Sequence, residues 1–338
     1  MQLQQRINAF SKLGYFLKDI ASENSPYFQH LIRSQNHNRW FTIENICFAL
    51  KNWSEVLSEE NIITWLKTYT FSEKAPKTIA VIMAGNIPLV GFHDFIAVLV
   101  SGNKVLAKLS SNDKILLPFL SEKLIEMEPE FKNYIEFTEN KLERFDAVIA
   151  TGSNNTALYF EHYFGKYPNI IRKNRNSVAV LTGTETVSQL EGLSEDIFSY
   201  FGLGCRNVSK LYVPKGYNFE LFFKSMFSQK EVIHHDKYMN NYDYNKAVYL
   251  MGGVNLLDNE FLLLKEDPAL SSPISVVFYE YYTNFENLKN SLTQNRETIQ
   301  CIVSDSGIEG EVHFGKSQSP QLWEYADGVD TLKFLATL

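Results

Sequence analysis

The chain has 338 residues, of which 45% are hydrophobic and 14% aromatic, so it is long enough to bury a large core and to divide into two domains. Its formal net charge of -7 argues against a general role on nucleic acids or anionic membranes, because phosphate groups are bound chiefly by clustered Lys and Arg. The longest apolar run, 95–100, is far too short to span a bilayer, and the first residues lack the pattern of a secretory leader. We therefore expect a cytoplasmic protein without a membrane span.

The three cysteines, Cys47, Cys205 and Cys301, are widely spaced, which is typical of neither a disulfide framework nor a paired metal motif. Reduced thiols are the simplest expectation. The neighbouring pair His234 and His235 is better explained as part of a loop than as metal ligands, so no metal site is predicted.

Residues 1–72 are predicted to be helical, because apolar side chains such as Ile7, Phe10 and Leu13 recur at helical spacing. From Thr78 onward, short β-rich runs alternate with helices, which is typical of a parallel sheet. The predicted strands here are TIAVIMA, KVLAKL, IEF, FDAVIAT and SVAVLT, and helices are predicted up to Val100, over Asp113–Glu128 and over NTALYFEHYF. A further helix, to about Phe201, is followed by the predicted strands KLYVP, AVYLM and ISVVFYEYY of a second sheet.

Cys205 is the candidate nucleophile. It lies in the stretch FGLGCRNVSKLYVP, where Gly202 and Gly204 let the backbone bring the sulfur close to a ligand. The cationic Arg206 favours the thiolate form. On this local context alone, a buried structural cysteine is an equally good explanation.

Polar residues also follow several predicted strands, and ligands of open α/β sheets bind beyond the carboxyl ends of the strands. The candidates are Asn86 after the first strand, Lys108, Ser110 and Ser111 after the second, and Gly152 and Ser153 after FDAVIAT. An Asn amide can donate to an oxyanion, Lys and Ser can hold ribose or phosphate oxygens, and a helix start can face a pyrophosphate. Each also has a plain explanation as a turn residue, a solvated lysine or a helix cap.

Taken in order, these features resemble the aldehyde dehydrogenase superfamily. An Asn turn, a strand ending in Lys, a Thr-Gly-Ser turn and a Cys preceded by Gly follow one another in both. Within that superfamily the chain is most similar to the acyl-CoA reductase family, which includes the reductase component of the bacterial-luminescence fatty-acid reductase system. The segments that carry this similarity are RWFTIEN, MAGNIPLVGFHD, FGLGCRNVSKLYVP and QLWEYADGVDTLKFL.

The resemblance implies an α/β fold with a doubly wound Rossmann-type cofactor domain and an α/β catalytic domain. We expect residues 1–186 to form a helical N-terminal segment and the dinucleotide-binding domain, to which the tail 316–338 returns. Residues 187–315 would form the catalytic domain with the nucleophilic Cys205.

The resemblance also implies roles for single residues. Asn86 would stabilise the oxyanion together with the backbone N–H of Cys205. Cofactor binding would fall to Lys108, Ser110, Ser111, Gly152 and Ser153, and to Glu266. The last resembles the glutamate that binds the nicotinamide ribose in this superfamily, although its spacing to the following proline is longer than usual.

One departure from the superfamily pattern predicts the direction of the reaction. Aldehyde-oxidising members carry a Glu-Leu-Gly-Gly segment whose glutamate activates water, whereas the corresponding stretch here, 171–177, contains no carboxylate. A thioester on Cys205 would therefore persist until hydride arrives, which favours reduction of an acyl thioester over oxidation of an aldehyde.

A second departure concerns the cofactor. Where relatives that prefer NAD often have a glutamate on the adenosine ribose, this chain has Ser111, and a hydroxyl does not repel a 2′-phosphate. We therefore expect NADPH, while a serine also tolerates NADH.

The expected activity is NADPH-dependent reduction of a long-chain fatty acyl-CoA to the aldehyde through an acyl-cysteine intermediate. The resemblance also implies an acyl-protein synthetase as a partner that supplies acyl groups, and the sequence is compatible with a homo-oligomer. Two alternatives remain open. The chain could be a cysteine acyltransferase or thioesterase without hydride chemistry, or a non-catalytic partner of an acyl-activating ligase.

Overall fold

The computed structural model describes residues 1–22, 24–71 and 75–338, and its chain divides into two compact units. The first unit comprises Met1–Asn174 and Gln321–Leu338, and the second comprises Arg175–Pro320. The boundary thus falls at 174/175 instead of the expected 186/187, and the tail joins the first unit from 321 instead of 316. Positions 23 and 72 of the predicted helical region lie outside the described residues. Within the described ranges, no helix has the length and apolar character needed to cross a membrane.

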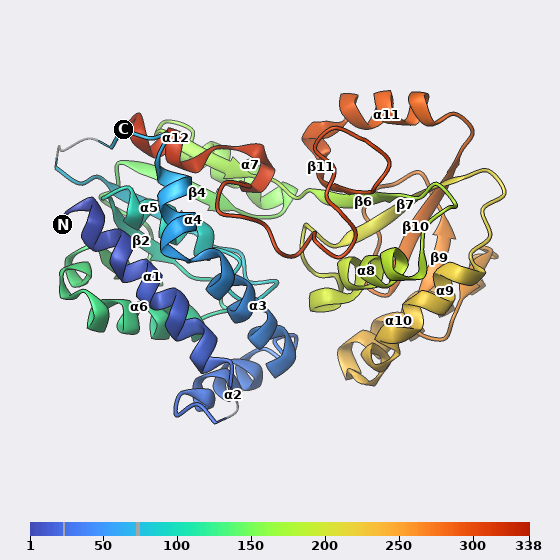
Figure 1. The fold of residues 1–338 in the computed structure, drawn as a ribbon, viewed down its shortest axis with the longest axis horizontal. Coiled ribbons are helices and arrows are strands. Elements are labelled where there is room, and N and C mark those ends of the chain that lie inside the picture. Colours follow the sequence, from blue (N-terminus) through green and yellow to red (C-terminus); the bar gives the residue numbers. More distant parts are fainter. Residues whose placement is uncertain (23, 72–74) are drawn as a thin grey trace. The chain divides into compact units, whose positions relative to one another are not determined.

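The first unit is built on a parallel sheet with the strand order β3-β2-β1-β4-β5. Figure 1 labels β2 and β4 of this sheet. Its strands are β1 (Thr78–Ile82), β2 (Lys104–Lys108), β3 (Ile135–Phe137), β4 (Ala147–Thr151) and β5 (Asn169–Arg172). The chain adds β2 and β3 on one side of β1 and then places β4 and β5 on the other side. The winding therefore reverses between β1 and β4, and such a switch point is where open α/β sheets bind their ligands.

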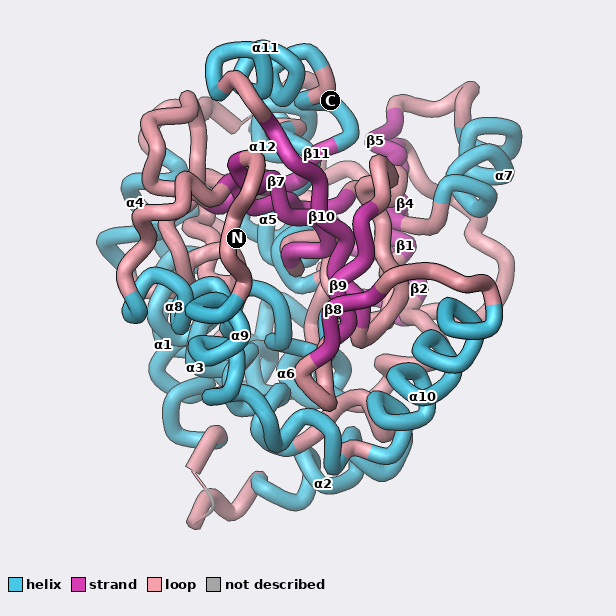
Figure 2. The backbone as a smooth tube through the Cα atoms, turned by 90° about the vertical axis from the view of Figure 1, so that its right-hand side faces the viewer, coloured by secondary structure: helices cyan, strands magenta, loops and turns pink. Residues whose placement is uncertain are grey.

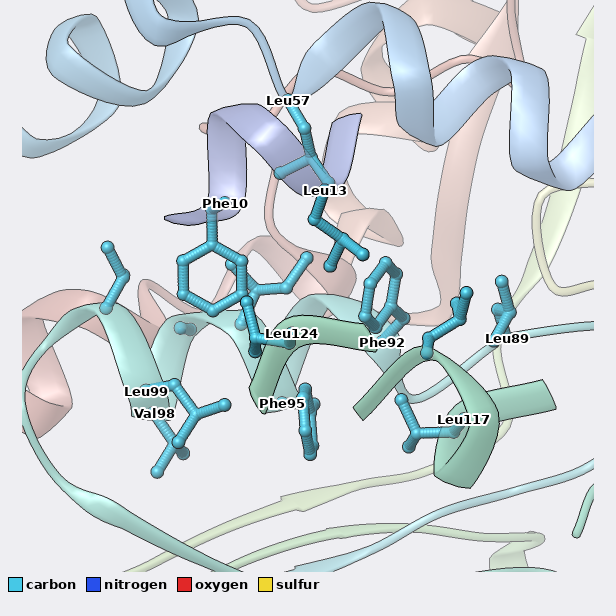
Figure 3. Packing of buried hydrophobic residues seen from close by; sticks show 14 of the residues in the cluster. Phe10, Leu13, Leu57, Leu89, Phe92, Phe95, Val98, Leu99, Leu117 and Leu124 are labelled. Carbon is cyan, nitrogen blue, oxygen red and sulfur yellow. The ribbon is translucent and has the colours of Figure 1, made fainter. Parts of the chain in front are cut away.

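Helices cover both faces of this sheet. They are α1 (Leu3–Ile20), α2 (Phe28–His37), α3 (Ile43–Val56), α4 (Glu59–Leu66), α5 (Phe92–Val100), α6 (Leu116–Met127), α7 (Asn154–Phe164) and the C-terminal α12 (Thr331–Ala336). Successive strand residues point to opposite faces, so Val81 packs in the cluster of α1, α5 and α6 while Ala80 packs against Phe160 of α7. Figure 3 shows Phe10 of α1 and Phe95 of α5 in the larger cluster.

The second unit has its own sheet, in the order β11-β6-β7-β10-β9-β8. Its strands are β6 (Asn176–Val180), β7 (Val208–Pro214), β8 (Leu256–Asp258), β9 (Leu263–Glu266), β10 (Val276–Tyr282) and β11 (Ile299–Val303). Only β8 pairs in antiparallel fashion, along β9 at the edge of the described sheet (Figure 2). The helices are α8 (Val187–Phe198), α9 (Glu220–Met226), α10 (Asp236–Met251) and α11 (Phe285–Gln294). Residues of α10 and α11 pack against one face of the sheet, and Phe219 at the start of α9 contacts Tyr279 on the other.

The prediction that SVAVLT belongs to the first sheet is wrong, because this segment forms β6 between β11 and β7 of the second sheet. The prediction also lacked β5, which ends at Arg172. Parallel strands of one sheet require a crossover of about a dozen residues or more, whereas only 173–175 separate β5 from β6. The two strands must therefore lie in different sheets.

The predicted strand AVYLM is also wrong, because residues 247–251 form the last part of helix α10. In the structure, the buried Tyr238 and Tyr242 and the half-buried Tyr249 fall at intervals of four and seven residues, which is the period of a helix face. Tyr244 points away from that face and is 68% exposed.

The turns that follow β1 and β2 are packed directly against each other. A Cβ atom on Gly85 would lie 2.5 Å from Oγ of Ser110, so a larger residue at this position would have to displace the Ser110 side chain. The second turn is also held from outside the sheet, since the His37 ring at the end of α2 donates from Nε2 to the carbonyl oxygen of Ser111 at 2.7 Å.

A buried carboxylate links the same two turns. Oδ2 of Asp113 accepts a hydrogen bond from the backbone N–H of Leu89 at 3.0 Å, and Leu89 has a left-handed backbone with φ of 58°. Asp113 is 7% exposed, and this burial raises the pKa of its carboxyl from 3.8 to about 6. Because the folded state binds this proton more tightly than the unfolded state, Asp113 makes the fold less stable as the pH rises from about 4 to about 6.

We predict that Asp113→Asn removes this pH dependence. Its amide oxygen still accepts from Leu89, and it stays neutral at every pH. The free energy of unfolding of the variant, relative to that of the wild type, is expected to rise by about 2.4 kcal/mol between pH 4 and pH 7, because one pKa unit corresponds to about 1.4 kcal/mol and the unfolded carboxyl is already partly ionised at pH 4. Urea denaturation at several pH values measures this difference. A difference between the two proteins that stays constant across this pH range, whatever its size, would contradict the prediction.

Candidate active site

Cys205 lies in the second unit, between α8 and the amino end of the central strand β7. Its side chain is exposed, so a buried structural cysteine is excluded for this position. None of the three cysteines, all of them in the described ranges, is in a disulfide. The exposed thiol on a loop before a buried strand is therefore accessible to a substrate.

The hydroxyl of Ser177 on β6 holds the backbone of Cys205. It donates to the carbonyl oxygen of Cys205 at 2.9 Å and accepts from the backbone N–H of Cys301 at 3.1 Å. Ser177 is fully buried, so these hydrogen bonds are made out of contact with water. The main chain at Cys205 is thus attached to two neighbouring strands of the sheet.

Arg206 contacts the sulfur of another cysteine. Its Nη1 lies 3.3 Å from Sγ of the buried Cys301 and donates to the carbonyl oxygen of Ser317, also at 3.3 Å. Its guanidinium thus connects β11 to the segment around Ser317. Stabilisation of the Cys205 thiolate by Arg206 remains a prediction.

In the first unit, the sheet brings the other candidate residues to one edge. Ile82 at the end of β1 is in register with Lys108 at the end of β2 and with Ala150 in β4. The turns with Asn86, Lys108 and Gly152 therefore follow neighbouring strands at the same, carboxyl edge, on both sides of the switch point. Asn86 is exposed there.

Several of these residues also have structural roles. Oγ of Ser153 accepts from the backbone N–H of Thr156 at 3.2 Å and so caps α7. A Cβ atom on Gly152 would lie 3.0 Å from the Thr156 side chain, so the strand end and the helix approach each other closely. Oγ of Ser110 accepts from the N–H of Asn112 at 3.2 Å inside its own turn. The contacts of Gly152 and Ser153 fix the start of α7, whose first N–H groups have no partner within the helix.

A pocket of about 830 Å³, which was not predicted from the sequence, lies beside this edge. Aromatic side chains of α7 and the loop before β4 form much of its wall, and Ile82 and Lys108 line it from the strand ends. Its charged lining residues are Lys108, Lys141, Arg144 and Lys166, with Glu143 as the carboxylate among them. The surplus of cations favours an anionic ligand, and the aromatic wall favours a flat ring system. Two features of the sequence could have indicated this pocket: the charged run KLERF and the aromatic residues at helical spacing in NTALYFEHYF.

Lys108 is placed by its surroundings. Its Nζ donates to the carbonyl oxygen of Asn140 at 3.0 Å, which draws the side chain along the loop between β3 and β4. The ammonium group therefore lies at the pocket wall and is not simply extended into solvent.

Glu266 ends β9 in the second sheet. It is in register with Tyr279, which is in register with Leu211 of β7. Cys205 lies three residues before Val208, the first residue of β7, and β9 lies two strands away from β7. The contact between Glu266 and a nicotinamide ribose remains a prediction.

The segment 171–177, which lacks a carboxylate, has a structural role instead. The guanidinium of Arg172 is buried, forms an ion pair with Asp94 of α5 and donates to Oγ1 of Thr331 at 2.9 Å. Lys173 pairs with Glu161 on α7 at 2.9 Å. Arg172 therefore ties the C-terminal α12 to the first sheet and is not available to bind phosphate groups of a substrate.

Asn86 belongs to the first unit and Cys205 to the second. Their joint role at an oxyanion, and the cofactor contacts assigned to Lys108, Ser111, Gly152 and Ser153, therefore remain predictions.

Comparison with known proteins gives a consistent result. The model of the acyl-CoA reductase (LuxC) family matches residues 18–221, which is more than half of the chain. No individually curated protein matches the sequence.

Solved structures show the same fold at low sequence identity. Aldehyde dehydrogenase 21 from Physcomitrella patens, solved with succinate, is similar with a TM-score of 0.72 at 14% identity, over 100% of this chain and 84% of that one. The P. syringae indole-3-acetaldehyde dehydrogenase AldA, a mutant in complex with NAD+ and IAA, is similar with a TM-score of 0.67 at 12% identity, over 95% and 75%. The NAD+ complex of an aldehyde dehydrogenase from Bacillus cereus is similar with a TM-score of 0.63 at 12% identity, over 90% and 72%. With an exposed cysteine before the central strand of the second sheet and a doubly wound first unit, the chain belongs to the acyl-CoA reductase (LuxC) family of oxidoreductases and has the aldehyde dehydrogenase fold.

Proposed function

We propose that this chain reduces a long-chain fatty acyl-CoA to the aldehyde with NADPH, through a covalent acyl group on Cys205. The observation that carries the proposal is the exposed thiol of Cys205 on a main chain held by Ser177, in a member of an acyl-CoA reductase family. An accessible sulfur on a fixed backbone is what nucleophilic catalysis needs.

In the first step, the Cys205 thiolate attacks the thioester carbon and forms a new C–S bond. The negative charge that develops on the carbonyl oxygen is stabilised by the backbone N–H of Cys205 and by the amide of Asn86. When this oxyanion collapses, the bond to CoA breaks and CoA leaves as its thiolate, so the acyl group remains on Cys205. CoA is a good leaving group, so this step needs little acid assistance.

The acyl group then has to survive until it is reduced. No carboxylate occurs within 171–177, and the buried Arg172 of that segment is paired with Asp94. Without a general base for water in this segment, hydrolysis of the thioester is slow. The aldehyde is released once the carbon has been reduced and its bond to Cys205 breaks.

The residues of the first unit fit a dinucleotide. NADPH, when bound, supplies the hydride for the reduction. The pocket of about 830 Å³ has the size of a cofactor site, and its aromatic wall suits the adenine ring. Lys108 and the seryl turn would hold the adenosine ribose, and the start of α7 at Gly152 and Ser153 would bind the pyrophosphate or the nicotinamide end.

The charges at the pocket favour NADPH over NADH. Lys141, Arg144 and Lys166 join Lys108 there, and Ser111 stands where a carboxylate would repel a 2′-phosphate. The acyl donor in this proposal is acyl-CoA. An acyl-protein synthetase that delivers the acyl group directly is the partner to test beside it.

We predict that Cys205→Ser lowers the rate of acyl-CoA-dependent NADPH consumption by at least ~10³-fold, because the hydroxyl is a far weaker nucleophile than the thiolate. The matched control is Cys47→Ala, which removes a thiol of the first unit and is expected to keep the wild-type rate. Acyl-CoAs of graded chain length are compared, and aldehyde and CoA are both quantified.

Without NADPH, mass spectrometry is expected to find one acyl group on the peptide that contains Cys205. Equal activity of wild type and Cys205→Ser would refute the proposal. Continuous CoA release without NADPH would instead identify a thioesterase or acyltransferase.

The cofactor choice has its own test. Lys141→Gln and Arg144→Gln remove positive charge from the pocket while keeping a polar side chain, and each is expected to raise the KM for NADPH about 10-fold, equivalent to about 1.4 kcal/mol. The KM for NADH is expected to change less than about 2-fold, because NADH lacks the phosphate. Arg33→Gln on α2, outside the pocket lining, is the control. An equal rise in the KM for NADPH and for NADH would show that these charged residues do not bind the 2′-phosphate.

A further inference from the structure

The loop that joins α8 to Cys205 follows a strained path. Tyr200, Phe201 and Gly202 have φ of 53°, 59° and 76°, all in the left-handed region. Non-glycine residues rarely adopt this conformation, and here two of them are consecutive. Such a backbone persists only where surrounding groups hold it in place.

One side chain, Asn207, is bonded to both ends of this loop. Its Nδ2 donates to the carbonyl oxygens of Ser199 at 2.8 Å, Asp196 at 3.1 Å and Ile197 at 3.3 Å, where α8 ends. Its Oδ1 accepts from the backbone N–H of Gly204 at 2.8 Å. Asn207 is 3% exposed, so these bonds are made away from water.

The main chain of Asn207 completes the attachment. Its backbone N–H donates to the carbonyl oxygen of Gly204 at 3.0 Å. Gly204 is therefore bonded to Asn207 through both its N–H and its C=O. The peptide group between Gly204 and Cys205 is trans, so its N–H points opposite to its C=O. Fixing the Gly204 carbonyl thus fixes the direction of the Cys205 N–H.

The end of α8, to which Asn207 is bonded, is itself anchored. The carboxylate of Asp196 accepts from the N–H groups of Gly315 at 2.7 Å and Ser317 at 2.9 Å. Asp196 is fully buried. Asn207 therefore connects the loop to a fixed point of the second unit and not to a mobile chain end.

We infer that Asn207 is the positioning residue of the nucleophile loop, which sets the direction of the Cys205 backbone N–H through Gly204. An amide suits this task because it offers donors to the carbonyls of α8 and an acceptor to Gly204 at once. Aspartate offers no donor when ionised, and alanine offers neither. The consequence for turnover rests on the proposed function, whereas the consequence for the loop does not.

The test combines amide hydrogen exchange with steady-state kinetics on Asn207→Ala and Asn207→Asp. In both variants, exchange in the peptide covering 199–206 is expected to be at least ~10-fold faster, because the loop opens more often. The kcat for acyl-CoA reduction is expected to fall ~10–100-fold, since a displaced oxyanion donor costs about this much. The KM for acyl-CoA is expected to stay within about 3-fold of the wild-type value, because the buried side chain of Asn207 does not itself contact the substrate.

Asn245→Ala is the matched control. Asn245 is a buried asparagine of α10, and its Nδ2 donates to the carbonyl oxygen of Ile274 at 3.0 Å. Its loss is expected to lower stability without changing exchange at 199–206 or the kcat. If Asn245→Ala lowered the kcat as much as Asn207→Ala does, the role of Asn207 would be merely structural and the inference would fail.

Two further outcomes are decisive. If a variant at Asn207 does not fold, exchange in the wild-type protein still tests the inference, because the Gly204 amide is expected to exchange ~10²-fold slower than in an unfolded chain. Fast exchange at Gly204 would overturn it. If the wild type reduces no acyl-CoA, the proposed function fails, while the exchange results still decide whether Asn207 holds the loop.

Discussion

The short connection between β5 and β6 is the constraint from which the two-unit architecture follows. Only 173–175 separate these strands, and parallel neighbours in one sheet cannot be joined by so few residues. The chain must therefore start a second sheet. At the end of β5, Arg172 is fixed by the buried ion pair with Asp94 and by Thr331 of α12, so the point where the chain leaves the first unit is also the point where its tail is attached. Arg172, which lies in the segment 171–177 without a carboxylate, thus stabilises the fold.

At the carboxyl edge of the first sheet, the backbone itself sets the geometry of the candidate cofactor site. Gly85 touches Ser110 and Gly152 touches Thr156 so closely that a larger residue would displace its neighbour. Asp113 joins the first two turns from inside the protein. Because these contacts leave the turns little room to move, the edge is preorganised for a ligand, and the adjoining pocket adds the charges that favour a phosphate.

In the second unit, buried polar side chains act on the backbone around an exposed sulfur. Ser177 binds the carbonyl of Cys205 and Asn207 binds Gly204 on the other side, while the thiol itself stays accessible. This separation reconciles two needs of a covalent catalyst. The reacting atom has to meet substrate from solvent, and the groups that stabilise charge beside it have to be fixed before the reaction begins.

Local signals in the sequence were sufficient for much of the fold. Helical spacing, caps and short β-rich runs predicted α3, α5, α7 and most strands of the first sheet, and glycines beside Cys205 marked the loop that carries it. They failed where a pattern was short or ambiguous. The four-residue β5 gives little periodic signal. The short apolar run AVYLM was predicted as a strand, but it forms the end of helix α10.

The sequence by itself determined the order of the motifs, the presence of a candidate nucleophile at Cys205 and the absence of a carboxylate in 171–177, because these are properties of residue identity and local spacing. Only the tertiary structure decided that β6 belongs to the second sheet, that Glu266 is in register with Tyr279, that Arg206 contacts Cys301 and that Asn207 is hydrogen-bonded to Gly204. Those facts depend on strand register and on contacts between residues distant in the chain, and no local pattern of side chains records them.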